Sequence, residues 1–243
     1  AEADGDEFVI NGTKHFISYA DVADFIVLFA ASGVEETSKG AKKKITSFLV
    51  DKDTPGLDVR MGPHSVSHRG FHHCELVFNN CRVNKRQVLG EVHRGFDVAN
   101  QWLGATRLTV AAQCVGRAQR AMEMAAQWAA TRKQFGQTIG KFQGTSFKLA
   151  DMATEIEAAN LLCLQTAWKT DQGTATDADY AMAKLFATEM LARVTDQTVQ
   201  IFGGMGLMEE VGVERLWRDA RVERIWDGTS EIQRHIISRS VLR

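Results

Sequence analysis

A single aspartate is the sequence's candidate for proton chemistry, and it stands in the turn-forming segment Trp226-Asp227-Gly228. A carboxylate held beside an aromatic ring loses solvation, and this raises its pKa toward the range in which a general base works. A structural interpretation competes, because an aspartate near a helix N-terminus is favoured by the helix dipole. Ser230-x-x-Gln233 also has the form of a capping box for a last helix. The residues alone favour the structural interpretation.

Two other segments have the composition of an anion-binding site. Arg132-Lys133-Gln134-Phe135-Gly136 combines two cations with an aromatic ring, which suits a flat anionic ligand. Gln200–Gly206 ends with three glycines in four positions, so that backbone N–H groups are open to a phosphate or a ribose. Each segment is equally explained as the end of a helix, where cations and glycine are favoured.

Histidines are crowded in one further stretch, at His64, His68, His72 and His73. Gly70 interrupts this stretch, and no carboxylate or thiol spacing completes a set of metal ligands, so no metal site is predicted. The sequence also has no phosphate-binding loop and no nucleophile elbow.

The three polar segments interrupt a helical half of the chain. No proline follows Pro63, alanine becomes frequent from about residue 98, and apolar residues recur at helical spacing. The predicted helices cover residues 95–132, 143–171, 175–203 and 230–242, with shorter helical pieces between 209 and 225. Helices of such length are typical of an up-and-down bundle.

The first part of the chain has the pattern of strands and turns instead. Asn11-Gly12 predicts a two-residue hairpin, and the polar segment 35–44 predicts an exposed loop. Further strands are predicted at Phe25–Ala31, Ile45–Asp51, Leu57–Met61 and Cys74–Phe78. The predicted fold class is therefore α+β, with an antiparallel β domain (an incomplete barrel) at 1–88 and an up-and-down four-helix bundle at 89–243.

The composition excludes several classes of protein. A formal net charge of −1 argues against a nucleic acid partner. The longest apolar run, near Phe25–Ala31, is far shorter than the ~20 residues that a membrane span needs. Ala1–Asp4 is acidic, unlike a targeting segment, and the absence of an initiator methionine leads us to expect a fragment or a processed product. Scattered cysteines favour a reducing compartment: Cys74, Cys81, Cys114 and Cys163.

Taken together and in order, these segments resemble the acyl-CoA dehydrogenase family. The helical half carries the resemblance at Arg132–Gly136, Leu149–Met152, Gln200–Gly206, Arg218–Ala220 and Asp227–Arg234. The β half carries it at Phe8–Lys14, Phe16–Ser18, Thr54–Gly56 and Glu75–Val83. Each piece is a weak signal, whereas the ordered combination is specific and spans nearly the whole chain.

The resemblance implies a middle β domain at 1–88, incomplete at its N-terminus, and a C-terminal helical domain at 89–243 that binds FAD and forms oligomers. The family's N-terminal helical domain and its flavin-contacting Thr-Glu-Pro segment would lie before Ala1. Phe16 and Ser18 match positions at the flavin, where the family more often has Trp and Thr.

Six further residues match cofactor positions in the helical half. Those that would hold the adenosine diphosphate part of FAD, supplied from the neighbouring subunit, are Arg132, Phe135, Gln200 and Gly204. Thr229 and Glu231 match additional cofactor contacts near the last helix.

The implied reaction is the α,β-dehydrogenation of an acyl-CoA thioester, in which a carboxylate removes the α proton and the flavin accepts the β hydrogen as hydride. Asp227 matches the usual glutamate base and is one methylene shorter. Some relatives carry the base at the position of Thr106, which cannot serve, so Asp227 is the candidate base. Trp226 and Arg107 are assigned to the substrate pocket.

Two alternatives remain beside this function. One is an aspartate-base flavin oxidase similar to nitroalkane oxidase, and the other is a noncatalytic or truncated assembly protein of this fold. The resemblance also implies an electron-transferring flavoprotein as acceptor, a homodimer or homotetramer, and a cytoplasmic (bacterial) or mitochondrial matrix location.

Overall fold

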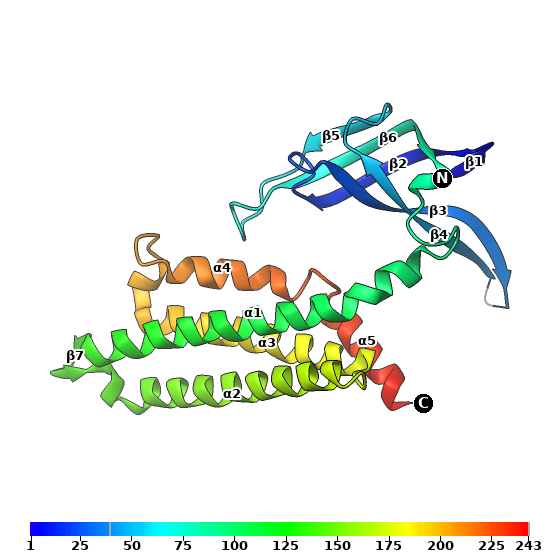
Figure 1. The fold of residues 1–243 in the computed structure, drawn as a ribbon. Helices are drawn as coiled ribbons and strands as arrows, with labels where there is room; N and C mark the ends of the chain where they lie inside the picture. The colour runs from blue at the N-terminus through cyan, green and yellow to red at the C-terminus, as the bar shows by residue number, and fades with distance from the viewer. Residues whose placement is uncertain (39, 243) are drawn as a thin grey trace. The chain divides into compact units, whose positions relative to one another are not determined.

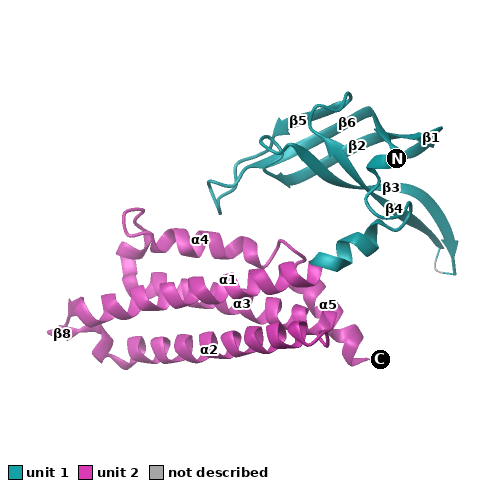
Figure 2. Ribbon diagram, in the orientation of Figure 1, with its two compact units in different colours: residues 1–102 teal, residues 103–243 magenta. Residues whose placement is uncertain are grey.

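The computed structural model describes residues 1–38 and 40–242. The chain divides into two compact units, residues 1–102 and residues 103–243 (Figure 2). Helix α1 (Gly95–Thr131) begins in the first unit and continues into the second. The domain border that the sequence predicts between residues 88 and 89 therefore stays a prediction.

Antiparallel strands build the first unit (Figure 1). Four of them form one sheet in the order β1-β2-β6-β5, and the other two, β3 and β4, form a separate ribbon. Their bounds are Glu2–Asp4 (β1), Glu7–Ser18 (β2), Phe25–Thr37 (β3), Gly40–Asp51 (β4), Leu57–Met61 (β5) and His73–Asn84 (β6). A 3-10 turn, η1 (Lys85–Gln87), follows. The strands close no barrel among the described residues, in agreement with the predicted incomplete barrel.

Alternation along the strands builds the core of this unit. Phe8 and Ile10 of β2 are buried while their neighbours in the strand are partly exposed, as a period of two requires. Phe8 packs edge-on against Phe48 of β4, with 5.1 Å between the ring centroids. This contact joins the four-stranded sheet to the ribbon.

The hairpin predicted at Asn11-Gly12 is wrong. Strand β2 runs through both residues, and its pairing with β6 shifts register between Ile10 and Gly12. Gly12 has a φ of 144°, and the backbone N–H of Asn80 donates to the Asn11 side chain at 2.8 Å. Glycine's freedom at positive φ serves a β-bulge as readily as a tight turn, so the dipeptide alone does not distinguish them.

The exposed loop predicted at 35–44 is also wrong over most of its length. β3 and β4 continue as an antiparallel ribbon with Thr37 opposite Gly40, and Lys39 lies outside the described residues. Backbone pairing does not depend on side-chain polarity, and charged residues such as Glu35 and Lys42 are tolerated opposite each other on an exposed ribbon.

Five helices dominate the described part of the second unit, and α1, α2 and α3 run antiparallel in sequence order (Figure 1). The helices after α1 are α2 (Gln143–Asp171), α3 (Asp177–Phe202), α4 (Val213–Glu223) and α5 (Ser230–Val241). Short elements join them: β7 (Lys133–Gln134), β8 (Gln137–Thr138), η2 (Ile139–Lys141) and η3 (Gly203–Leu207). The helices predicted from the apolar period are confirmed within two residues at each end.

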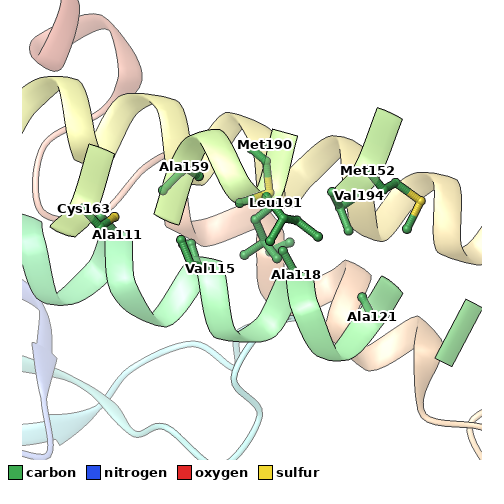
Figure 3. Packing of buried hydrophobic residues seen from close by; sticks show 14 of the residues in the cluster. Ala111, Val115, Ala118, Ala121, Met152, Ala159, Cys163, Met190, Leu191 and Val194 are labelled. Atoms are coloured by element: carbon green, nitrogen blue, oxygen red, sulfur yellow. The ribbon is translucent and has the colours of Figure 1, made fainter. Parts of the chain in front are cut away.

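Small side chains set the packing of the bundle. One face of α1 presents alanines to α2 and α3, among them Ala111, Ala118 and Ala121 (Figure 3). They lie against larger residues such as Met190 and Leu191 of α3, which are fully buried. Alternation of small and large residues lets helices approach closely and fill the interior without voids.

All four cysteines are free and buried. Cys114 lies in the bundle core, where burial raises the pKa of its thiol well above the usual range. Burial likewise raises the pKa of Cys163 to about 11. Within residues 1–38 and 40–242, no helix combines the length and the hydropathy that a membrane crossing would need.

Candidate functional site

The candidate base lies in the turn between α4 and α5. Two consecutive residues of this turn have left-handed backbone, Asp227 with a φ of 51° and Gly228 with a φ of 91°. A positive φ is uncommon outside glycine, although aspartate tolerates it better than most residues. Such strained backbone persists only where neighbouring groups hold it, and it is frequent at functional sites.

Two buried side chains hold the backbone of this turn. Lys184 of α3 donates from Nζ to the carbonyl oxygens of Trp226 at 2.8 Å and Gly228 at 2.7 Å. Gln233 of α5 donates from Nε2 to the carbonyl oxygens of Asp227 at 3.2 Å and Gly228 at 2.9 Å. Both side chains are fully buried. Lys184 was not among the site residues predicted from the sequence, although a lysine among the apolar residues of a buried helix face is unusual.

The electrostatic surroundings of Asp227 suit a base. Burial raises the pKa of its carboxyl group, while the positive charges of Lys184 and Arg107 act in the opposite direction. The Nε atom of Arg107 is buried and has no hydrogen-bond partner among the described residues. The carboxyl group therefore lies near two cations in a partly desolvated place, and its raised pKa makes it a stronger proton acceptor than an exposed aspartate.

Trp226 is fixed through its indole. Its Nε1 donates to Oε2 of Glu223 at 2.7 Å, and the other carboxylate oxygen of Glu223 accepts from Arg117 of α1. Burial raises the pKa of Glu223, against the lowering effect of Arg117. The indole is thus held by the fully buried carboxylate of Glu223, which is itself paired with the partly buried Arg117.

The capping box predicted at Ser230-x-x-Gln233 is wrong, because the N-cap of α5 is one residue earlier. Thr229 is the N-cap of α5, and its hydroxyl accepts from the backbone N–H of Ile232 at 3.4 Å. Ser230 is buried and donates to Glu189 of α3 at 2.7 Å. Thr229 takes the extended φ and ψ of an N-cap, so Ser230 is left free to bind another helix. Glu231 is exposed in the first turn of α5, where its backbone N–H and Thr229 lower the pKa of its carboxyl group.

A groove of about 440 Å³ lies elsewhere on this unit, beside the α1–α2 connection. Two predicted cofactor residues, Phe135 and Gln200, line it together. The remaining lining residues are Gln134, Ile139, Phe142, Gly144, Thr145, Lys148 and Ile201. Phe135 has a φ of 49° and is 92% exposed, and its ring meets Phe142 edge-on at 6.2 Å.

The other two residues predicted for the same cofactor part do not line this groove. Arg132 is exposed, and its guanidinium lies 6.0 Å from the ring centre of Trp128, which in turn stacks on Phe202. Gly204 is exposed in η3, and a Cβ atom there would meet no other atom within 4 Å. Space therefore does not require glycine at this position.

Phe16 and Ser18, the residues predicted to contact the flavin, belong to the first unit. Phe16 has a φ of 58°, is 72% exposed and lies edge-on to His73 at 6.2 Å. Ser18 is opposite His73 in the β2–β6 ladder. In the histidine-rich stretch, His72 binds Asp21 at 2.7 Å, and the described residues contain no cluster of three or more metal-ligating side chains.

The chemistry of the groove fits the adenosine diphosphate part of FAD. An exposed aromatic ring, Phe135, offers a stacking surface for an adenine base, and the amide of Gln200 can pair with a polar ring edge. Two cations could serve phosphate oxygens: Lys148 lines the groove, and Arg132 lies two residues before the lining residue Gln134.

Comparison with known proteins covers both units. The sequence profile for "Acyl-CoA dehydrogenase, C-terminal domain" matches residues 93–242, and that for "Acyl-CoA dehydrogenase, middle domain" matches residues 1–81. A probable acyl-CoA dehydrogenase of Bacillus subtilis, YngJ, is 41% identical over the whole of this chain, which covers 63% of that protein.

Solved structures agree with these matches. The butyryl-CoA dehydrogenase of Megasphaera elsdenii aligns with a TM-score of 0.91 and 37% identity, over 100% of this chain and 62% of its own. The FAD complex of PigA aligns with a TM-score of 0.93 and 30% identity, over 99% of this chain and 62% of its own. The chain thus spans less than two thirds of the length of the proteins that it matches.

Proposed function

Because the chain belongs to the acyl-CoA dehydrogenase family, we propose that it forms the base-bearing, FAD-binding part of an enzyme that dehydrogenates an acyl-CoA thioester between its α and β carbons. The similar butyryl-CoA dehydrogenase acts, by its name, on a short acyl chain. Short-chain acyl-CoA compounds are therefore the first substrates to try.

The observation that carries the proposal is the environment of Asp227. The carboxyl group stands in a turn fixed from two helices, and burial raises its pKa while Lys184 and Arg107 keep positive charge nearby. A carboxylate in this state takes the proton from the α carbon of the thioester, and the cations stabilise the negative charge that accumulates as the proton leaves. Trp226, whose indole donates to Glu223, is proposed as one wall of the substrate pocket.

FAD, when bound, supplies the two-electron acceptor that the reaction needs. Phe135 and Gln200 would hold its adenine end, with Lys148 and Arg132 near the phosphates. Phe16, Ser18, Gly204, Thr229 and Glu231 are proposed as further contacts on the grounds of the family resemblance.

Partners follow from the same family membership. An electron-transferring flavoprotein is the proposed acceptor of the electrons, and a homodimer or homotetramer is the proposed assembly. A second groove, of about 500 Å³, supports the assembly, because helices α2, α3 and α5 leave apolar side chains exposed beside it. Its apolar lining residues are Leu162, Met182, Leu185, Phe186 and Ile237. A matching face of a second copy would cover them.

One observation favours a second candidate, a flavin oxidase that uses an aspartate base and no CoA. Aspartate at position 227 places the carboxylate one methylene closer to the backbone than glutamate would. An α carbon carried by a small substrate that enters more deeply fits this shorter side chain.

An anaerobic titration of the FAD-loaded protein with straight and branched acyl-CoA compounds tests the proposal. Loss of the oxidised flavin absorbance with one of them is the expected result. Asp227→Asn should lower the rate of this bleaching by about a thousandfold, because a general base contributes about 10²–10⁴ to the rate. The exposed Asp196 of α3 offers a matched control, and Asp196→Asn should bleach normally.

Two outcomes would reject the dehydrogenase. If Asp227→Asn bleaches the flavin at an unaltered rate, Asp227 is not the base. Bound flavin that no acyl-CoA bleaches points to the oxidase if a nitroalkane is consumed with oxygen, and to a noncatalytic role if it is not.

A further inference from the structure

The turn that carries Asp227 is held by a buried cation, and we propose that Lys184 and Gln233 act together as a clamp that positions the Asp227 carboxylate. The clamp consists of Lys184 of α3, Gln233 of α5 and the three backbone carbonyls of residues 226–228. This inference rests on the proposed function of Asp227, but its structural part can be tested without flavin.

The burial of Lys184 demands an explanation. Its side chain is fully buried, and burial lowers the pKa of its ammonium group. A buried ammonium group is strongly unfavourable unless hydrogen bonds compensate, so lysine is rarely fully buried. Here the compensating acceptors are two carbonyls, at 2.8 and 2.7 Å, that belong to the residues on either side of Asp227. The cation is therefore committed to the backbone that surrounds the carboxylate.

Gln233 fixes the same backbone from the opposite end. Its amide donates to the carbonyls of Asp227 and Gly228, so that Gly228 O accepts from both clamp residues. Glycine is required at 228 for two reasons, the φ of 91° and a Cβ that would lie 2.7 Å from Nε2 of Gln233. A longer residue at 228 would push the amide away from the turn.

The clamp also determines the charge that Asp227 meets. The groups that act on its carboxyl group are Lys184 of α3 and Arg107 of α1. Lys184 in turn is subject to Asp227, to Cys114 of α1 and to Glu223 of α4, which favour its charged form, and to Arg107, which opposes it. The ammonium group thus does two things at once: it holds the turn in the left-handed conformation and it favours the ionised carboxylate.

The direct test is a titration of Asp227 in the chain labelled with [¹³Cγ]aspartate, followed by NMR. The Asp227 signal is identified by its absence in Asp227→Asn. In Lys184→Met, which is unbranched and one atom shorter and which removes the charge, the titration midpoint of Asp227 should move upward. A midpoint that stays in place in a folded variant overturns the clamp's electrostatic part.

A kinetic test addresses the positional part and uses a milder variant. Gln233→Met removes the amide donors without changing a charge, and in the FAD-loaded protein it should lower kcat about tenfold while KM changes less than about threefold, as for a base held less well. Lys184→Met should lower kcat about a hundredfold. If Lys184→Met does not fold, Gln233→Met alone decides, and an unchanged kcat there overturns the clamp.

Lys169→Met is the matched control, because Lys169 is another lysine that contacts a carboxylate in this unit, Asp179, at 2.6 Å. It should lower the melting temperature without moving the Asp227 midpoint or kcat. The two proposals fail separately. If Asp227→Asn still turns over substrate, Asp227 is not the base, and an upward shift of the Asp227 midpoint in Lys184→Met would still support the clamp. If Asp227→Asn is inactive but the midpoint in Lys184→Met and the kcat of Gln233→Met are unchanged, only the clamp is rejected.

Discussion

The turn at 226–230 and the groove beside the α1–α2 connection belong to the same helical unit, yet they are built in opposite ways. The turn is tied to α3, α4 and α5 by buried side chains, each with a partner on another element. The groove is lined by side chains that reach into solvent, and its main aromatic residue, Phe135, is 92% exposed. One place is complete within the chain, whereas the other presents open surface.

This difference follows from the two kinds of chemistry. Proton transfer depends strongly on the distance and pKa of the base, so its geometry must be fixed before the substrate arrives. Holding an adenine and two phosphates requires contact area and positive charge, which can be completed by the ligand itself or by a second copy of the chain. We therefore expect large effects on folding at the turn and mainly effects on binding at the groove.

The largest folding effect is expected from Arg117→Ala. This change removes the arginine that pairs with the fully buried Glu223. Removal of one partner of a fully buried pair costs about 3–5 kcal/mol, and we expect a loss near the lower end because Arg117 is 30% exposed. Urea unfolding measures the loss. Arg193→Ala removes the cation of a more exposed pair with Glu155, and should cost less than about 1 kcal/mol. Equal losses of unfolding free energy in the two variants would contradict the difference between a turn held by buried side chains and a solvent-exposed surface.

At the groove, Phe135→Ala should affect binding but not folding. Loss of a stacked aromatic ring costs about 1–3 kcal/mol of binding to a base, which corresponds to at least a roughly fivefold rise in the Kd for FAD. The melting temperature of the FAD-free chain should stay the same, because the ring is exposed. Fluorescence quenching of FAD measures the Kd. Phe147 of α2 is also exposed, and Phe147→Ala should bind FAD with an unchanged Kd. An equal rise of the Kd in Phe147→Ala would argue against a specific adenine site at Phe135.

The smallest expected effect is the loss of stability that the buried Asp227 carboxyl group causes when it is ionised. Because the folded pKa of this carboxyl group is raised, its contribution to stability is present below the unfolded pKa and is lost as the pH rises through the folded pKa. Asp227→Asn has no such loss, so its advantage in melting temperature over the parent chain should grow as the pH rises above the ordinary aspartate pKa of about 3.9. An advantage of ~1 kcal/mol would appear as about 2–4 °C. A difference that shrinks with pH would contradict a raised pKa.

Much of the fold was predictable because its signals are local or periodic. The helices were found from the apolar period, and Gly173 and Gly203 follow the ends of α2 and α3 at positive φ, as expected of helix-ending residues. The strands of the ribbon were found only in their apolar halves. Their polar halves are held by backbone pairing across the ribbon, which leaves no pattern in the side chains.

The site was predictable where a residue type is itself the signal, and not where the signal is a tertiary contact. Asp227 and Trp226 drew attention as a carboxylate next to an aromatic ring. Lys184 was passed over because the buried stripe of its helix was predicted from apolar residues alone, and a lysine is rarely buried. The same limitation explains Ser230: a hydroxyl at a helix start is read as a cap, while its actual partner, Glu189, is 41 residues away in the chain.

The buried thiols allow the opening of this bundle to be measured by chemical labelling. Only a thiolate reacts quickly with an alkylating reagent, and Cys114 is both fully buried and held in its thiol form. It can therefore be labelled only during moments when the helices separate. If those openings are brief compared with the labelling reaction, the rate of Cys114 modification reports the equilibrium between the closed and the open bundle around this residue. The measurement needs no denaturant. Cys163 on the facing helix supplies an independent second reading of the same openings.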